Sequence, residues 1–250
     1  MQQPLKFNNV ELPDFVKVTG RSISVLPPVS TQSSSVPNRI GQVFNRSILE
    51  PREYTFDIKV LLNDKELDEQ ADILQKWLIG NEFKPSKLMF KERPDRYINA
   101  VITGNTDLTD LFFLGEGQIT FRADNPLWYK ENTQTTSGTG SVTVSYSGTV
   151  TTSPVIEITL EKNCKRVEVV NSAVSNKVIS LSADFKTGQK LVIDCNRRLV
   201  TLNGTVNMNL LNLSTDWFFI MPNLSNVLTV KLDSAASTAS LKVTNSVIYY

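Results

Sequence analysis

The chain has 250 residues, 40% of them hydrophobic, which is enough for two folded cores and argues against disorder. It contains no histidine, which excludes Ser-His-Asp and Cys-His catalysis and histidine-based metal sites. The net charge is +1, with 15 basic and 17 acidic side chains before residue 126 and 11 and eight after it, so charge alone predicts no nucleic-acid-binding surface in either half.

Residues 5–26 are predicted to form short strands. Residues 1–15, MQQPLKFNNVELPDF, contain no continuous apolar stretch of the kind found in secretory signal peptides. No apolar run reaches the roughly 18 to 20 residues that a membrane span needs. We therefore expect a protein that is made in the cytoplasm, stays soluble and does not insert into a membrane.

Residues 27–53 form a Ser-rich segment that is too long to be an ordinary connection. Loops longer than about 12 to 15 residues in compact domains are usually functional or disordered. This one contains both apolar and arginine side chains, which favours a hairpin arm that contacts another subunit; a mobile surface loop is the open alternative. The candidate subunit-interface residues are Arg39, Val43, Phe44, Arg46, Ile48 and Leu49.

A strand and a helix are predicted next. Apolar and polar residues alternate from Tyr54 to Leu62, the pattern of a half-buried strand. The helix is expected over 64–79, capped by Asn63 or Asp64 and stopped by Gly80. Its apolar stripe consists of Leu67, Ala71, Leu74 and Leu78. The acidic residues of its first half are interpreted as a solvated face, not as a metal or catalytic cluster.

Three more strands are predicted at 87–90, 97–102 and 118–121, with Pro94 and Asp95 in the turn between the first two. Strands that flank one helix indicate an α+β domain with an antiparallel or mixed sheet.

The segment ITFRADNPLWY, residues 119–129, predicts a joint between two domains. Pro126 ends the strand, and the Ser/Thr/Gly-rich tract 132–153 has too few large apolar residues to hold a core of its own. We therefore predict a first domain at 1–125, a linker at 126–135 and a second domain at 136–250. Trp128 and Tyr129 are candidate exposed aromatic contacts.

The second half is predicted to be a β-sandwich. Short strands recur about every ten residues, with no helical pattern. Gly188, Asn203 with Gly204, and Asn223 mark tight turns between them. The expected strands are 155–160, 166–170, 177–181, 190–194, 198–202, 216–220, 227–232 and 239–243.

Cys164 and Cys195 are expected to be free, buried thiols, because one bridge in a chain of this size is not a disulfide framework. No cofactor and no metal are predicted.

The order of these segments resembles the distal tail proteins of phages with long non-contractile tails. The resemblance covers essentially the whole chain. The segments that carry it are YTFDIKVLL with DKELDEQADILQKWLI, LMFKERPDRYINAVITG, ITFRADNPLWY, TGQKLVIDCNRRLVTLNG and DWFFIMPNLSNVLTV.

This resemblance implies a mainly β fold, with a ring-forming α+β first domain and a galectin-like β-sandwich as the second. It implies a structural, non-enzymatic protein that forms a ring, generally of six copies, and joins the tail tube to the baseplate or tail tip, where it anchors the host-adsorption device. The implied partners are itself, the tail tube protein and a tail-tip, baseplate or receptor-binding protein. Genome DNA would pass through the ring without specific binding. The implied location is the virion, at the tail tip, after assembly in the host cytoplasm.

Two other functions stay open. A carbohydrate-binding module would stack sugar on an exposed aromatic, for which the candidates are Trp128, Tyr129, Tyr146, Trp217, Tyr249 and Tyr250. Trp217 and Phe219 alternate in a predicted strand, however, so one of them should face the core. A glycosidase would need paired carboxylates, but no spacing singles out a pair among Asp184, Asp194, Asp216 and Asp233.

Overall fold

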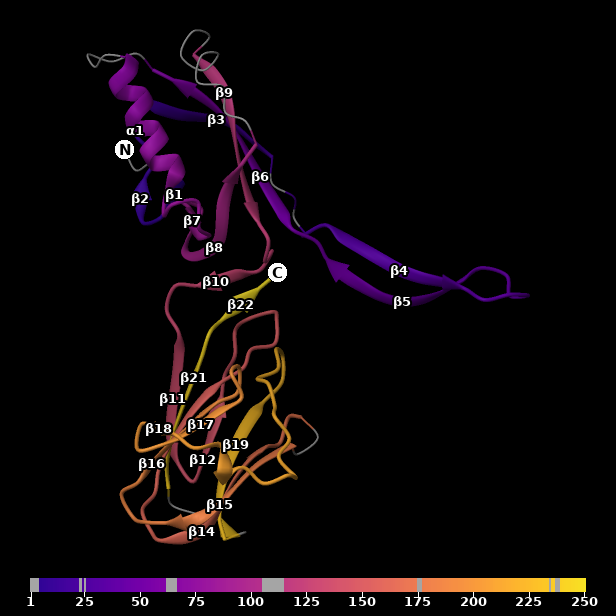
Figure 1. Cartoon of the computed structure of the whole chain (residues 1–250), viewed down its shortest axis with the longest axis vertical. Coiled ribbons are helices and arrows are strands. Elements are labelled where there is room, and N and C mark those ends of the chain that lie inside the picture. The colour runs from indigo at the N-terminus through magenta and orange to yellow at the C-terminus, as the bar shows by residue number, and fades with distance from the viewer. Residues whose placement is uncertain are drawn as a thin grey trace. The chain divides into compact units, whose positions relative to one another are not determined.

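The computed structural model describes residues 5–22, 24, 26–61, 67–104, 115–174, 177–233, 235–236 and 239–250. The fold is mainly β, as predicted, with one α-helix in this described part of the chain (Figure 1). The chain divides into two compact units, residues 1–129 together with Tyr250, and residues 130–249.

The first unit is built on an antiparallel sheet. Seven strands follow one another in the order β2-β1-β7-β8-β9-β6-β3, while β4 pairs with β5 alone. The elements up to the boundary are β1 (Leu5–Phe7), β2 (Val10–Glu11), β3 (Val16–Ser22), β4 (Val29–Ser35), β5 (Gln42–Leu49), β6 (Arg52–Val60), α1 (Leu67–Ile79), β7 (Ser86–Phe90), β8 (Arg93–Thr103), β9 (Glu116–Ala123) and β10 (Trp128–Lys130).

The predicted alternation of β6 is confirmed, because every second side chain of this strand from Arg52 to Val60 is buried. Its aromatic residues join a connected cluster with rings from the helix and from four other strands, at centroid distances of 4.8 to 6.2 Å. Aromatic pairs with tilted or edge-on rings add packing energy beyond their buried area. The cluster consists of Phe7, Tyr54, Phe56, Trp77, Phe90, Phe121 and Trp128.

Helix α1 is confirmed within the described residues and lies beside β1 and β2 (Figure 1). Its buried face differs from the predicted stripe. The buried side chains are Gln70, Leu74, Trp77 and Leu78, whereas Ala71 is only partly buried. Trp77 holds this face against the sheet: its Nε1–H donates a hydrogen bond to the carbonyl of Val10 in β2 at 3.1 Å.

The two ends of the helix differ in what is described. Gly80 ends it with a φ of 59°, a left-handed conformation that glycine adopts readily, as predicted. The capping residues Asn63, Asp64 and Glu66 and the side chain of Leu67 lie outside the described residues. The acidic side chains of the first helical turn, Asp68 and Glu69, are exposed.

The turn predicted at Pro94 and Asp95 is wrong. Phe90 pairs with Arg93, so the turn consists of Lys91 and Glu92, and Pro94 and Asp95 lie inside β8. The register of β7 against β8 is irregular between Met89 and Phe90. Proline is tolerated at such a bulge, where its missing N–H breaks no ladder hydrogen bond.

The second unit is a β-sandwich, as predicted. One sheet has the order β11-β21-β13-β16-β17-β18 and the other β12-β19-β14-β15, with β20 paired to β19. A single core cluster draws on both sheets. The elements are β11 (Gln134–Thr139), β12 (Ser141–Val144), β13 (Val155–Thr159), β14 (Cys164–Asn171), β15 (Lys177–Phe185), β16 (Lys190–Asp194), β17 (Leu199–Leu202), β18 (Thr205–Val206), η1 (Met208–Leu210), β19 (Asn226–Leu232), β20 (Ala235–Ala236), β21 (Ser240–Asn245) and β22 (Ile248–Tyr249).

The Ser/Thr/Gly-rich tract belongs to this sandwich. It forms β11 and β12, and Val142 and Val144 are buried in the core. The interval 126–135 itself contains β10 and the first residues of β11. Strand formation here needs few large side chains, because β11 pairs along its whole length with β21 and β12 with β19.

The strand predicted at 216–220 is wrong. Within it only Ile220 makes an isolated bridge, to Thr152, and Phe218 and Ile220 are fully buried, with Trp217 partly buried and Phe219 exposed. The other predicted strands are present, and the predicted turn residues all have positive φ angles. Cys164 and Cys195 are free and buried, as expected.

Candidate functional site

The segment 27–53 contains a two-stranded hairpin, which we call the arm. Strands β4 and β5 pair from Val29 with Leu49 to Ser35 with Gln42, and the Glu50 N–H donates to the Pro28 carbonyl at the base. Side chains also bond across the pair. Arg46 Nε donates to Gln32 Oε1 at 2.8 Å, and Asn45 Nδ2 donates to Ser34 Oγ at 2.6 Å. This confirms the hairpin that the sequence predicts.

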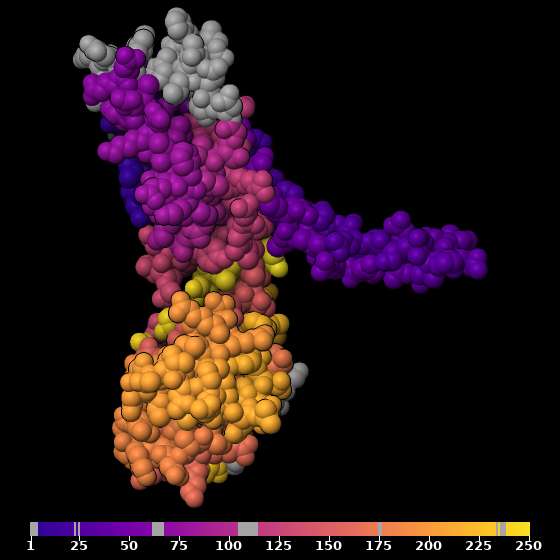
Figure 2. Space-filling view, in the orientation of Figure 1, coloured from indigo at the N-terminus to yellow at the C-terminus, as the bar shows by residue number. Residues whose placement is uncertain are grey.

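The arm has no core of its own. Both of its strands lie at the surface (Figure 2), and most of their side chains are exposed. An isolated two-stranded hairpin is marginally stable in water, because it buries little apolar area. The arm nevertheless carries large apolar side chains: Val29, Val36, Ile40, Phe44 and Leu49 are 37% to 103% exposed. Such a concentration of exposed apolar groups marks an interaction surface.

Charge adds to this apolar surface. Between residues 27 and 49 the chain has two arginines and no acidic residue. Of the six predicted interface residues, Arg39, Phe44, Arg46 and Leu49 are exposed, while Val43 and Ile48 are half-buried. Sequence reasoning missed Val36 and Ile40 of the turn. The signal that could have found them is the pair Asn38 and Gly41, residue types that favour a turn and that here have φ angles of 62° and 86°. The apolar residues beside such a turn stand at the tip of the hairpin.

Of the two aromatics at the joint, Trp128 is not an exposed contact. It is 2% exposed, and its ring lies 5.2 Å from that of Phe90 and 5.8 Å from that of Tyr54. Tyr129 is half-buried, stacks on Tyr97 at 5.7 Å and accepts a hydrogen bond from Asn125 at 2.8 Å. The sequence places Trp128 and Tyr129 after a proline, but it does not show whether other strands bury these side chains.

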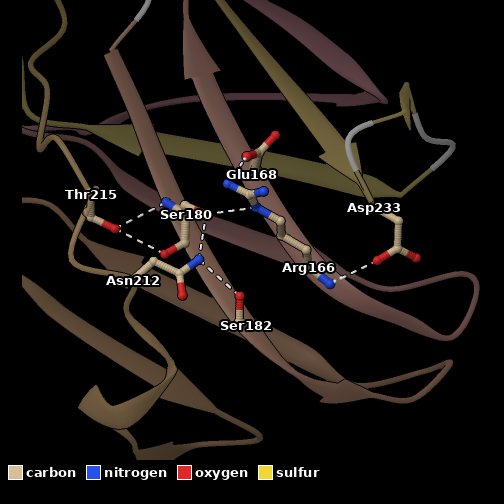
Figure 3. Close-up of polar contacts among 7 residues, drawn as sticks. All are labelled: Arg166, Glu168, Ser180, Ser182, Asn212, Thr215 and Asp233. Atoms are coloured by element: carbon tan, nitrogen blue, oxygen red, sulfur yellow. Dashed lines mark hydrogen bonds and ion pairs between the residues drawn. The ribbon is translucent and has the colours of Figure 1, made fainter.

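The second unit has a polar network on β14 and β15 (Figure 3). Arg166 Nε donates to Ser180 Oγ at 3.2 Å, and Arg166 Nη2 pairs with Glu168 Oε1 at 2.8 Å. Asp233 Oδ1 accepts the backbone N–H groups of Lys165 and Arg166 at 2.9 and 3.0 Å.

Asn212 and Thr215 complete the network from the other side. Asn212 Nδ2 donates to the hydroxyls of Ser180 and Ser182 at 2.7 and 2.9 Å, and Thr215 Oγ1 donates to the Ser180 carbonyl at 3.0 Å. The network thus ties the segment after η1 to β15. Since its members bond to one another, we assign it a structural role.

The aromatic side chains of the second unit form no evident sugar platform in the described residues. Trp217 packs against the core, and the Tyr146 hydroxyl donates to the Val150 carbonyl at 2.6 Å. Tyr249 is 9% exposed, whereas Phe219 is 45% exposed and stands in an irregular segment.

Two of the four candidate aspartates of the second unit, Asp194 and Asp233, have structural partners. Asp194 accepts the N–H groups of Asn196 and Arg197 at 2.9 and 3.0 Å, as Asp233 does for β14. Across the described ranges no three Cys, Asp or Glu side chains are grouped so that they could hold a metal ion. Nor does any helix of those ranges have the length and apolar character needed to cross a membrane.

Two family models match the chain. The model described as a phage tail protein RIFT-related domain matches residues 12–123, and the model described as a siphovirus-type tail component, C-terminal domain, matches residues 147–246. The first covers the elements from β3 to β9, which include the helix and the arm but not β1 and β2. The second covers most of the sandwich.

Similar proteins come from phages. The distal tail protein of Bacillus phage SPP1 is 24% identical over 229 residues, which are 90% of this chain and 89% of that protein. The crystal structure of SPP1 Dit, described as a paradigm of the hub adsorption apparatus in phages that infect Gram-positive bacteria, is similar with a TM-score of 0.79 and 17% identity over 99% of both chains. A chain of the phage P2 baseplate, in its activated conformation with Ca, matches with a TM-score of 0.43 and 13% identity over 98% of both chains.

Proposed function

The chain belongs to the distal tail protein family of siphophages, and we propose that it forms a ring of six copies. The proposed ring joins the tail tube to the baseplate or tail tip. The chain is a structural component of a phage tail and baseplate, and its location is the virion tail. The finer proposal is the ring, which would anchor the host-adsorption device and leave a passage for the genome. We propose no catalytic role.

The observation that carries the ring is the exposed arm. Five exposed large apolar side chains and two arginines stand on a hairpin that pairs with no other strand in the described residues. A ring of identical subunits needs a heterologous interface, in which one patch docks on a different patch of the neighbour and rotation closes the set. An arm that reaches the next copy supplies the first patch, and burial of its apolar side chains supplies the driving force.

The tube and the tip proteins are the proposed neighbours above and below the ring. DNA would pass through without specific binding, for which a near-neutral first unit is suitable, because a strongly positive lining would hold phosphates. Assembly would take place in the host cytoplasm, and a receptor-binding protein would attach directly or through the tip protein.

Light scattering on the purified chain tests the ring. We expect a mass that is six times that of the 28.0 kDa protomer. Replacing residues 30–48 by Asn-Gly removes the arm but keeps Val29 and Leu49 as a cross-strand pair next to a tight turn. This variant should fold, because loop removal costs little closure entropy. It should be monomeric, because the arm that would dock on the neighbour is gone. Rings of unchanged mass from the variant would contradict the role of the arm.

Two further measurements test the role in the particle. A phage that lacks this protein should accumulate capsids without completed tails. The purified protein should bind duplex DNA only weakly at physiological salt. Normal tails in the mutant would refute the hub role, and tight sequence-specific DNA binding would indicate a regulator instead.

A further inference from the structure

A cavity lies at the root of the arm, within the first unit. It has a volume of about 300 Å³, and its lining includes Arg21, Arg52, Phe90, Glu92, Arg93 and Trp128. Arg21 is near the end of β3 and Arg52 is the first residue of β6, so these two stand on the strands that lead into and out of the arm. Three guanidinium groups against one carboxylate leave the cavity with a surplus of positive charge.

Arg52 is the unusual member of this group. It is 3% exposed, and its Nε and Nη1 atoms have no hydrogen-bond partner in the described part of the chain. An arginine in a protein stays protonated, and a buried charge without a partner is costly. Arg52 Cζ lies 5.3 Å from the centroid of the Tyr54 ring, a contact that attracts the cation but leaves those two nitrogens without an acceptor.

The carboxylate in the cavity does not supply that acceptor. Glu92 Oε1 pairs with Arg21 Nη1 at 2.8 Å. Burial alone would raise the pKa of Glu92, but a backbone hydrogen bond, the bond from Arg21 and the nearby charges of Arg21 and Lys91 lower it, so this carboxylate is charged and engaged. Arg93 lies over the Trp128 ring at 5.9 Å, which places a third cation on the same wall.

We propose that this cavity is a binding site for an oxyanion, a carboxylate or a phosphate group, with Arg52 as its central ligand and Arg93 as a second positive charge. An anion that accepts hydrogen bonds from Arg52 Nε and Nη1 would supply these two nitrogens with charge-assisted hydrogen bonds, the strongest class. The buried Tyr54 hydroxyl, beside the ring that Arg52 contacts, also has no hydrogen-bond partner in the described residues. The oxyanion is either a free ion or the acidic side chain of a neighbouring polypeptide.

Calorimetric titration of the full chain with sodium phosphate and with sodium acetate, at constant ionic strength in chloride, tests the site. We expect one saturable site per chain for at least one anion. In Arg52→Met, which keeps the length of the side chain but removes the charge, the affinity should fall at least tenfold. Arg122→Met is the matched control: it removes an arginine of the same unit that pairs with Asp124 at 2.9 Å, outside the cavity, and should change affinity less than twofold.

The two anions distinguish the sources. Preference for phosphate indicates a free ion, and preference for acetate indicates a protein carboxylate. If Arg52→Met does not fold, as judged by circular dichroism, Arg93→Met replaces it, with the same direction of effect expected. A crystal structure of the full chain in which an acidic residue of a neighbouring copy contacts Arg52 Nε or Nη1 would also support the site. No saturable binding of either anion, together with a crystal structure that has no carboxylate there, would overturn it.

Discussion

A Cβ atom added to Gly80 would lie 2.5 Å from Cε1 of Phe7. Gly80 ends α1 with a positive φ, and Phe7 stands in β1 with its ring against Trp77 and Phe121. The end of the helix therefore packs directly against the first strand at Gly80. Glycine fits this position for two reasons: it has no Cβ to clash with Phe7, and it adopts a positive φ without strain.

Replacing Gly80 by alanine should destabilise the first unit by about 2 kcal/mol or more, because a left-handed backbone costs an alanine ~1–2 kcal/mol and overpacking adds to it. Gly104→Ala is the control, since it has a similar φ of 83° but no atom within 4 Å of the added Cβ. Chemical denaturation of both variants measures the difference. Equal effects would mean that the Phe7 contact does not matter.

Replacing Ile40 by aspartate should lower the mass that light scattering measures, because it places a charge on the most exposed apolar residue of the arm, which is 103% exposed. Leu213→Asp provides the matched control: this leucine is 108% exposed but belongs to the second unit. An unchanged assembly in both variants would remove Ile40 from the proposed interface.

Glu157 should make stability depend on pH in the acid range. The hydrogen bond that Glu157 accepts from Lys190 is the main cause that lowers the pKa of this carboxyl, and the bond from Lys242 lowers it further, despite partial burial. Its contribution is therefore complete above the unfolded pKa of about 4.3 and is lost as the pH falls through the lower folded pKa. Because the pair is near the surface, Glu157→Gln should cost only about 0.5–1 kcal/mol at pH 7 and almost nothing near pH 2. Glu161→Gln, which changes an exposed glutamate, is the control variant in urea denaturation at the two pH values.

Both thiols should resist labelling in the folded protein. Burial, with the Asp194 carboxylate, raises the pKa of Cys195 to about 12, and burial raises that of Cys164. The thiolate is the reactive form, so a disulfide reagent at pH 8 should react at least tenfold more slowly with the native chain than with glutathione. Two thiols per chain should become reactive in denaturant. Rapid labelling of the native chain would show that the sandwich opens readily.

The two units should fold when they are expressed separately. Every member of the sandwich core cluster falls between Val142 and Val243, so residues 130–250 contain the whole of it. We expect a cooperative thermal transition for 130–250 and another for 1–129, measured by circular dichroism, with self-association confined to 1–129. Molten or aggregated fragments would indicate that the cores depend on one another.

The correct predictions concern features that residues close in sequence determine, and the incorrect ones concern features that depend on residues distant in sequence. The alternation of β6, the hairpin of the arm and the turn at Asn203 and Gly204 depend on neighbours within a few residues, so the sequence predicts them. The β7–β8 turn was misplaced because proline is a local turn signal, whereas the pairing of Phe90 with Arg93 moved the turn to Lys91 and Glu92.

By itself the sequence determined the mainly β fold, one helix, free buried cysteines and the family, because periodicity, turn residues and the order of segments are properties of a linear chain. Tertiary structure alone decided that Trp128 is buried, that Phe218 enters the core more fully than Trp217, and that Arg52 is enclosed with two nitrogens that have no hydrogen-bond partner among the described residues. Each of these outcomes depends on atoms from strands that are distant in sequence. Burial and charge pairing are set by what surrounds a side chain in space, and the residue type alone does not contain that information.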